Sequence, residues 1–367
     1  MRPAEPLALQ ALTPEAMVRA IPGVPLGHAR KLVAQIHRDE VIHTASQVSR
    51  ASVELLRERG HVPTLEVVEE APSQVDPFVK YVLRTPDGQL VEAVRIPLHK
   101  ERRFSVCVSS QVGCALACAF CATGRLGLTR NLETWEMVEQ VRVVHRGLKR
   151  DGLGRVHGVV FQGMGEPLSN LDRVLVAIDV LSEPTALSVD QRAITVSTSG
   201  LPVGIRRLAR EAPKVRLAWS LHSARAPVRR NLMPIDAAHP LEEVFDAVAE
   251  HAVATGYAPL WSITPLLGIN DDEAEARAVA ELAVRFAERT GVRPRISIIP
   301  YNRIDTDERD PFRRSTDERA ARFRTVMTEY KVFPIERYSG AGDVGGACGQ
   351  LARSARECDR ASVGTPR

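Results

Sequence analysis

Residues 111–121, Gln-Val-Gly-Cys-Ala-Leu-Ala-Cys-Ala-Phe-Cys, form the stretch that decides the fold class of this chain. They follow an apolar run, Phe104–Ser109, and place Cys114, Cys118 and Cys121 in a Cys-x3-Cys-x2-Cys pattern. Three thiolates on one short loop can bind three irons of a four-iron cubane, because thiolates are the soft ligands that such clusters require. The fourth iron then keeps an open position, where a small chelating molecule can bind.

A structural zinc site is the main alternative for these three cysteines. Such a site normally has a fourth Cys or His in a paired arrangement. The next histidines along the chain, His145 and His157, are distant from the loop and lack that spacing. The pattern therefore favours an iron–sulfur cluster.

The sequence on either side of this loop alternates between short apolar runs and amphipathic stretches. Six strand–helix units in succession predict a parallel sheet with right-handed crossovers. A closed barrel of eight units would need two more, so we expect an α/β fold with a partial (β/α)6 barrel. The expected strands are Phe104–Ser109, Val156–Gln162, Ala193–Ser197, Val215–Leu221, Leu260–Leu266 and Arg295–Pro300. The expected helices are Glu133–Lys149, Leu171–Leu181, Val203–Arg210, Leu241–Ala254, Glu273–Thr290 and Thr316–Tyr330.

Four segments follow from this alternation. Residues 1–60 are expected to form a small helical accessory domain, with a helix start at Thr13-Pro14. Residues 61–100 read as a short β extension with a hairpin around Thr85–Gly88. The core barrel takes residues 101–335, and residues 336–367 form a C-terminal tail.

Composition and charge indicate where in the cell the protein is expected to act. The 367 residues carry a net charge of +4, and no apolar run is long enough to cross a bilayer. The first residues lack the pattern of a signal peptide, so we expect a cytoplasmic protein without membrane contact. Basic residues cluster at 142–155, 225–230, 303–324 and 353–367, where solvated helix faces are the ordinary explanation.

Polar residues end the predicted strands, and in such barrels the carboxyl ends of the strands form the active site. The candidate cofactor-binding residues at these ends are Gly165, Glu166, Ser197, Ser220, Leu221, His222 and Asn302. Gly165 and Glu166 belong to Gly163-Met164-Gly165-Glu166-Pro167, where glycine allows close backbone approach and the carboxylate can accept from an ammonium group.

The cysteine spacing and these strand ends together resemble the radical S-adenosylmethionine (SAM) superfamily. The resemblance implies a [4Fe-4S] cluster held by Cys114, Cys118 and Cys121, with SAM on its open iron. Two further segments, Cys107–Cys114 and Ala347-Cys348-Gly349-Gln350-Leu351, resemble the RlmN/Cfr family of RNA adenosine methyltransferases. That similarity runs from about residue 90 to 351.

The family resemblance implies a division of roles among residues. One SAM would methylate Cys348, and a second, cleaved to a 5′-deoxyadenosyl radical, would take a hydrogen from that methyl group. The carbon radical would add to C2 of an adenine in 23S rRNA, and in tRNA as well. A base, Glu92, would remove the ring proton, and Cys107 would release the RNA and form a disulfide with Cys348. Because thiol–disulfide exchange needs contact, both cysteines should share one pocket.

Partners also follow from the resemblance. We expect a monomer that receives electrons from a flavodoxin or ferredoxin and binds RNA through the N-terminal helices and the 303–324 region. A target base buried in folded RNA must be extruded to reach the site. Cys358 has no counterpart in the family, and we interpret it as incidental.

Departures from the family pattern leave the RNA target open. They are the fifth strand, Trp261–Asn270, the glycine-rich tail Ser339–Gly346, Tyr301 in place of a common Trp, and Arg95 in place of an aromatic residue. Attack at C8 of adenine, another RNA, and a non-RNA substrate are alternatives. A zinc-stabilised RNA-binding module without catalysis is the alternative from another class.

Overall fold

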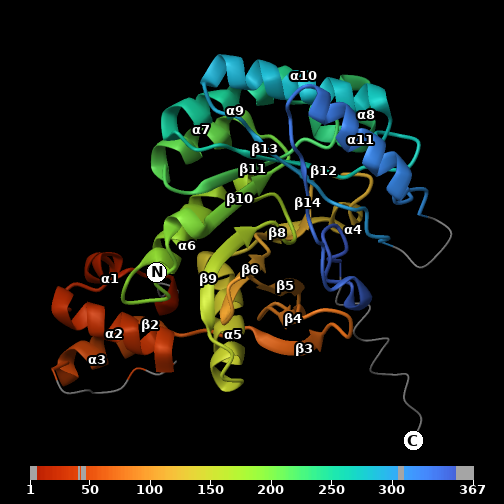
Figure 1. Ribbon diagram of the computed structural model, residues 1–367. Coiled ribbons are helices and arrows are strands. Elements are labelled where there is room, and N and C mark those ends of the chain that lie inside the picture. Colours follow the sequence, from red (N-terminus) through yellow and green to blue (C-terminus); the bar gives the residue numbers. More distant parts are fainter. Residues whose placement is uncertain (1–5, 40–41, 43–46, 305–309, 353–367) are drawn as a thin grey trace, which may run out of the picture.

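The computed structural model describes residues 6–39, 42, 47–304 and 310–352. Its centre is a ten-stranded sheet in which the strands from β6 to β14 run parallel (Figure 1). These parallel strands are β6 (Arg103–Val108), β9 (Arg155–Phe161), β10 (Ile194–Thr198), β11 (Arg216–Ser220), β12 (Leu260–Ile263), β13 (Arg295–Ile298) and β14 (Ile335–Glu336). The helices between them are α5 (Thr134–Arg150), α6 (Leu171–Ser182), α7 (Pro202–Glu211), α9 (Leu241–Thr255), α10 (Glu273–Thr290) and α11 (Asp317–Glu329).

This alternation confirms the predicted partial barrel. Every expected strand and helix is present, and most boundaries differ by one or two residues. The fifth strand ends at Ile263 instead of Leu266, ahead of Pro265, which has no N–H to donate to a neighbouring strand. A seventh parallel strand, β14, was not predicted, because a two-residue run carries no periodic signal.

The β extension belongs to the same sheet as the barrel. Strands β3 (Glu66–Pro72), β4 (Val79–Arg84) and β5 (Leu90–Pro97) are antiparallel, and β5 pairs with β6. In the described part of the chain, β14 and β3 are the two edges of the sheet, so the barrel is not closed.

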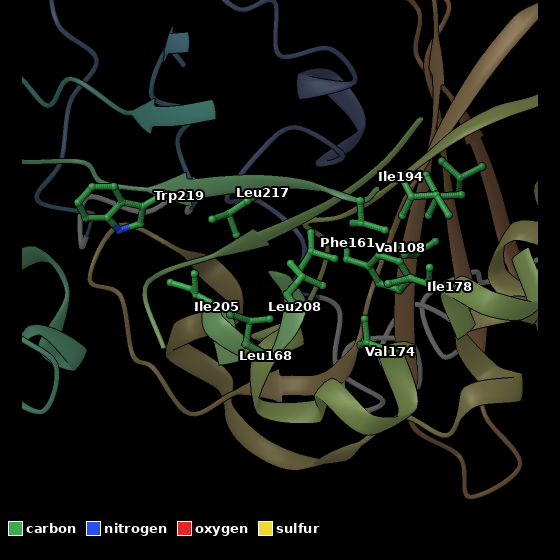
Figure 2. Packing of buried hydrophobic residues seen from close by; sticks show 14 of the residues in the cluster. Val108, Phe161, Leu168, Val174, Ile178, Ile194, Ile205, Leu208, Leu217 and Trp219 are labelled. Atoms are coloured by element: carbon green, nitrogen blue, oxygen red, sulfur yellow. The ribbon is translucent and has the colours of Figure 1, made fainter. Parts of the chain in front are cut away.

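The main hydrophobic core lies between the sheet and the helices that cover its outer face. Val108, Phe161, Ile194 and Leu217 point from the strands toward Ile178, Ile205 and Leu208 of α6 and α7 (Figure 2). Burying these aliphatic and aromatic groups fixes the parallel strands in register and thereby places their carboxyl ends side by side.

The N-terminal segment has its own core. Helices α1 (Pro14–Ala20), α2 (Leu26–Asp39) and α3 (Arg50–Arg59) pack around Met17, Leu32 and other apolar residues, as predicted for a helical segment. A short parallel pair, β1 (Leu7–Ala8) and β2 (Gly60–His61), closes the unit. Among the helices that the structure describes, none combines the length and apolar composition of a bilayer-spanning segment.

Two arginines of the basic clusters, Arg142 and Arg229, do not lie on solvated helix faces. Arg142 is 1% exposed, and its guanidinium donates to Glu139 and to the carbonyl of Ile36. Arg229 is fully buried and pairs with Asp236. The expectation was wrong for these two arginines because tertiary packing buries them together with a carboxylate partner. In the 303–324 cluster, Arg319, Arg322 and Arg324 pair with Asp271, Glu273 and Glu336, and their side chains stay 34% to 55% exposed. The basic residues in 353–367 lie outside the described residues.

Candidate active site

The three clustered cysteines lie on one loop above the first parallel strand. Cys114 ends β7 (Gln111–Cys114), which pairs with β8 (Gly127–Asn131), and Cys121 directly precedes α4 (Ala122–Leu126). Sequence reasoning missed this hairpin, although Gly113 and Gly127 were the signal. Gly113 has φ +76°, and a Cβ there would lie 1.8 Å from the carbonyl oxygen of Gly127. Only glycine fits this close approach.

The donor set of this loop fits an iron–sulfur cluster. Burial raises the pKa of the Cys114 thiol to about 11 and also raises the pKa values of Cys118 and Cys121. The charge of Cys121 raises the pKa values of Cys114 and Cys118 further, and the charge of Cys348 does the same for Cys121. A four-iron cubane takes each of three thiolates on a different iron, and the three cysteines of this loop can supply those thiolates.

A polar cavity adjoins this loop at the carboxyl ends of the strands. Most of the predicted cofactor-binding residues line it together with two of the cluster cysteines. The lining residues from the predictions are Cys118, Cys121, Gly165, Glu166, Ser197, Ser220, His222 and Asn302. The structure thus brings together residues from distant parts of the sequence, since Cys118 and Asn302 are 184 positions apart.

Gly165 and Glu166 follow the second parallel strand, β9, and Glu166 forms a hydrogen bond to the residue that follows the third, β10. Gly165 has φ +97°, and a Cβ would lie 2.5 Å from Cβ of Gln111. Glu166 accepts from the backbone N–H groups of Leu168 and Ser199, at 3.0 and 2.9 Å. Burial raises the pKa of Glu166 to about 7, and these hydrogen bonds oppose that shift. The carboxylate retains lone pairs that can accept from a ligand ammonium group.

The end of the fourth strand places one side chain in the cavity and another in the core. His222 has φ +56°, and its Nδ1 accepts from the N–H of Thr264. Burial lowers the pKa of His222 to about 3, so the ring is neutral. Leu221 is fully buried and packs in the core, and its carbonyl accepts from Arg229. The Leu221 side chain does not line the cavity, in contrast to the other predicted residues.

The tail lies against the cysteine loop. The N–H of Ala122 donates to the carbonyl of Gly349 at 2.8 Å, and Thr123 donates to the carbonyl of Leu351. Asn302 Nδ2 donates to the carbonyl of Cys348 at 3.2 Å and to Ser339 Oγ at 3.0 Å. These contacts hold Cys348 beside the cavity that adjoins the cluster loop.

Cys107 and Cys348 line one cavity, as predicted, and Cys121 also borders it. Cys348 and Cys121 line the polar cavity as well, so Cys348 lies where the two cavities meet. Burial raises the pKa of Cys107 to about 12, the charge of Cys348 raises it further, and the charge of Arg337 opposes the shift.

Glu92 lies beneath the tail and does not line either cavity. It is 1% exposed, pairs with Lys80 at 3.3 Å and accepts from the N–H of Ala352 at 2.8 Å. On strand β5 it shares a face with Val94 and Ile96, both of which line the Cys107–Cys348 cavity. A role as base would therefore require the Ala352 contact to open.

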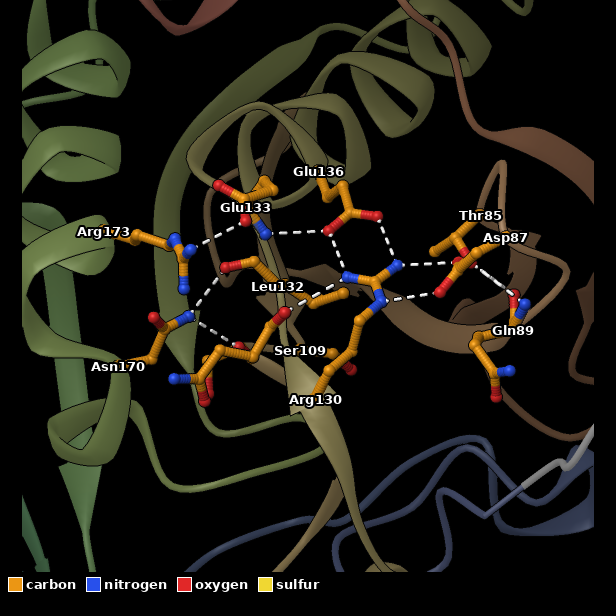
Figure 3. Close-up of polar contacts among 12 residues, drawn as sticks. Thr85, Asp87, Gln89, Ser109, Arg130, Leu132, Glu133, Glu136, Asn170 and Arg173 are labelled. Atoms are coloured by element: carbon orange, nitrogen blue, oxygen red, sulfur yellow. Dashed lines mark hydrogen bonds and ion pairs between the residues drawn. The ribbon is translucent and has the colours of Figure 1, made fainter. Parts of the chain in front are cut away.

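A further ionic cluster that sequence reasoning missed supports the hairpin. Arg130 of β8 lies between Glu136 of α5 and Asp87 of the β4–β5 turn (Figure 3). Its guanidinium makes paired contacts of 2.8 Å with each carboxylate. These charge-assisted bonds fix the strand that carries one side of the cysteine loop.

Comparison with known proteins agrees with this geometry. The model of the Radical SAM superfamily matches residues 108–283. The crystal structure of a radical SAM methyltransferase from Sphaerobacter thermophilus superimposes with a TM-score of 0.84, at 34% identity, over 94% of this chain and 99% of that chain.

Similar sequences narrow the family. A probable RNA methyltransferase of Sorangium cellulosum is 54% identical over 95% of this chain and 93% of its own length. A probable dual-specificity RNA methyltransferase RlmN 2 of Protochlamydia amoebophila is 37% identical over 90% and 89%. The dual-specificity RNA methyltransferase RlmN of Syntrophobacter fumaroxidans is 40% identical over 74% and 75%.

The partial barrel with its three-cysteine loop defines a radical SAM enzyme, a class that uses a [4Fe-4S] cluster and SAM. Within that class, the chain belongs to the RlmN family of SAM-dependent RNA methyltransferases.

Proposed function

We propose that this enzyme methylates C2 of an adenosine in 23S rRNA and also acts on tRNA, with the methyl group carried by Cys348. The observation that carries the proposal is the position of Cys348, which borders both the polar cavity and the cavity that contains Cys107. A methyl carrier has to reach its source on one side and its acceptor on the other. The dual-specificity names of the RlmN relatives support two RNA classes as substrates.

C2 of adenine lies between two ring nitrogens, is electron-poor and does not attack a methyl sulfonium. The cluster and SAM, when bound, supply the methyl group and the radical chemistry that this carbon needs. Cys114, Cys118 and Cys121 would hold the cluster. Gly165, Glu166, Ser197, Ser220, His222 and Asn302 would hold SAM, with Glu166 accepting from its amino group. Leu221 would act indirectly, because its buried side chain and the hydrogen bond from Arg229 to its carbonyl fix the strand end that carries Ser220 and His222.

The other residues act on the protein–RNA intermediate. Glu92 would take the proton from C2 after its contact with Ala352 opens. The adduct must also give up its unpaired electron, which a bound cluster would be able to accept. Cys107 would then attack the sulfur of Cys348 as a thiolate and break the bond between that sulfur and the methylene carbon. That carbon would take up a proton and become the methyl group of the released RNA, which leaves a Cys107–Cys348 disulfide. Deprotonating Cys107 is unfavourable in the buried cavity, and Arg337 is the cationic group that favours its thiolate.

We further propose that two SAM molecules are consumed in each turnover, one as methyl donor and one as radical source. Quantifying S-adenosylhomocysteine and 5′-deoxyadenosine against methylated RNA checks this ratio, with one of each expected per methyl group. The flavodoxin or ferredoxin donor, the monomeric state and the cytoplasmic location stay predictions.

Mass spectrometry of nucleosides from 23S rRNA and tRNA tests the proposal directly. A strain that lacks the gene should lose 2-methyladenosine from one or both RNA classes, and the gene supplied on a plasmid should restore it. Loss of 8-methyladenosine instead would transfer the assignment to C8. No change in either RNA class would contradict the proposed substrate.

A further inference from the structure

The open seam of the barrel leads to the Cys107–Cys348 cavity. The two sheet edges, β14 and β3, do not pair within the described residues, and a large cavity fills the inner face of the barrel beside β14. The residues that line both this inner cavity and the cavity with the two cysteines are Phe78, Ile96, Val160, Gln162, Arg337 and Tyr338. Of these, Phe78, Arg337 and Tyr338 lie on the β3–β4 turn and the tail, and we call these three residues the rim of the two cavities.

Tyr338 is an exposed aromatic side chain that is nevertheless fixed in place. It is 66% exposed, yet its hydroxyl donates to Asp76 Oδ2 at 2.9 Å. Its ring meets the ring of Phe78 edge to face, with centroids 5.9 Å apart. These two contacts still leave most of the Tyr338 surface open to solvent, and such a fixed aromatic ring loses little conformational entropy when it binds a flat partner.

The β3–β4 turn, which carries Asp76, also holds the backbone around Tyr338. Asp76 also accepts from the N–H of Ala341 at 2.9 Å, and Asp343 accepts from Ser73 Oγ at 2.7 Å. A Cβ at Gly340 would lie 2.5 Å from the ring of Phe78, so glycine lets the tail pack against this ring. The β3–β4 turn and the tail thus build the rim together.

Charge at the rim suits a polyanion on one side. Arg337 borders the opening, and its Nη1 is 3.5 Å from Gln162 Oε1. Asp76 is one acidic group at Tyr338, and it is engaged by the two hydrogen bonds described above. Asp343 is a second, and it accepts from Ser73 Oγ and from the N–H of Gln74. Glu336, a third nearby carboxylate, pairs with Arg324 at 3.0 Å.

We propose that Tyr338 is a stacking platform for an unpaired base of the substrate RNA, held at the rim while the target adenine enters the Cys107–Cys348 cavity. The proposal rests on the proposed RNA substrate and adds a binding residue to it. A base extruded from folded RNA loses its stacking partners, and proteins replace them with exposed aromatic rings. Arg337 supplies the positive charge that the adjoining phosphate requires.

Kinetics with full-length, cluster-loaded protein test the platform. Tyr338→Ala and Tyr338→Leu both remove the ring, and Leu keeps an apolar contact with Phe78. Both should raise the KM for protein-free 23S rRNA about 5- to 150-fold, the range expected from losing one stacked base, with kcat little changed. Tyr338→Phe keeps the ring and should stay near wild type. Phe333→Ala, which removes an aromatic ring of 69% exposure that lines neither cavity, is the matched control.

Two measurements separate this proposal from the methylation chemistry. The rate of reductive SAM cleavage without RNA should be equal in all variants, which would show that the fold and the cluster are intact. If the Ala variant loses this activity, the KM and affinity of the Leu variant test the platform instead. Affinity for a single-stranded adenosine-containing oligoribonucleotide, measured by fluorescence anisotropy, should fall in the Ala and Leu variants whichever RNA is methylated. An unchanged KM and affinity in these variants, or a Phe variant as weak as the Ala variant, would overturn the platform. Wild-type protein that binds the oligoribonucleotide through Tyr338 but leaves 23S rRNA and tRNA unmethylated would instead contradict the proposed function.

Discussion

At the scale of single residues, Cys107 offers the sharpest test of the release step. If Cys107 attacks the bridging sulfur, Cys107→Ala should stop the reaction after RNA has joined Cys348. We expect a covalent protein–RNA complex that resists denaturing gel electrophoresis and yields a modified Cys348 peptide after nuclease digestion. Cys358→Ala, which changes a cysteine without a proposed role, should release RNA normally. Only free RNA from the Cys107 variant would count against this role.

Asp87 predicts how acid affects stability. The hydrogen bonds from Arg130 hold the pKa of Asp87 well below its usual range, so the unfolded state takes up a proton at a higher pH than the folded state. The stabilisation is therefore complete above about pH 4 and is lost as pH falls toward the lowered pKa. The melting temperature of wild type should fall more steeply than that of Asp87→Asn between about pH 5 and about pH 3. Parallel curves would show that the pair contributes no pH-dependent stability.

At the scale of elements, the β7–β8 hairpin carries the cluster loop, and two of its glycines make a matched pair. Both have positive φ, but a Cβ on Gly113 would overlap the carbonyl of Gly127, whereas one on Gly127 would meet nothing within 4 Å. Gly127→Ala should cost only backbone strain, about 3 kcal/mol, because φ +71° with ψ 179° is a conformation that is essentially restricted to glycine. Gly113→Ala should cost roughly 1–3 kcal/mol more, because the strands must separate.

Iron content and melting temperature measure this difference. The Gly113 variant should bind less than stoichiometric iron after reconstitution, since moving β7 displaces Cys114. The Gly127 variant should reach the wild-type iron content. Equal iron content in both variants would mean that the hairpin does not determine the position of Cys114.

At the scale of the whole molecule, Arg142 ties the N-terminal helical unit to the barrel. Its side chain donates to the carbonyl of Ile36 in α2 at 2.7 Å and to Glu139 in α5 at 2.6 Å. Arg142→Met should destabilise the protein by about 3 kcal/mol, because Glu139 then stays buried after losing one of its two ion-pair partners among the described residues and keeps the other, Arg146. The N-terminal helices should become more sensitive to limited proteolysis.

A double variant separates the causes of this effect. Burial already raises the pKa of Glu139 to about 7, so neutralising this side chain should be tolerated once its partner is gone. Arg142→Met with Glu139→Gln should recover part of the lost stability while the helices stay sensitive to protease. A single variant as stable as wild type would show that Arg142 does not hold the two units together.

The amino-acid sequence by itself determined the order of strands and helices, the cluster-binding loop and the polar residues at the strand ends. These features have local causes, since periodicity and cysteine spacing are fixed by neighbouring residues. Only the tertiary structure decided that Leu221 packs inward, that Glu92 is covered by the tail, and that Arg142 and Arg229 are buried. It also placed Tyr338 beside Phe78 at the open seam. These outcomes depend on contacts between residues far apart in the chain, and the free energy of burying or pairing such groups is set by neighbours that no local pattern specifies.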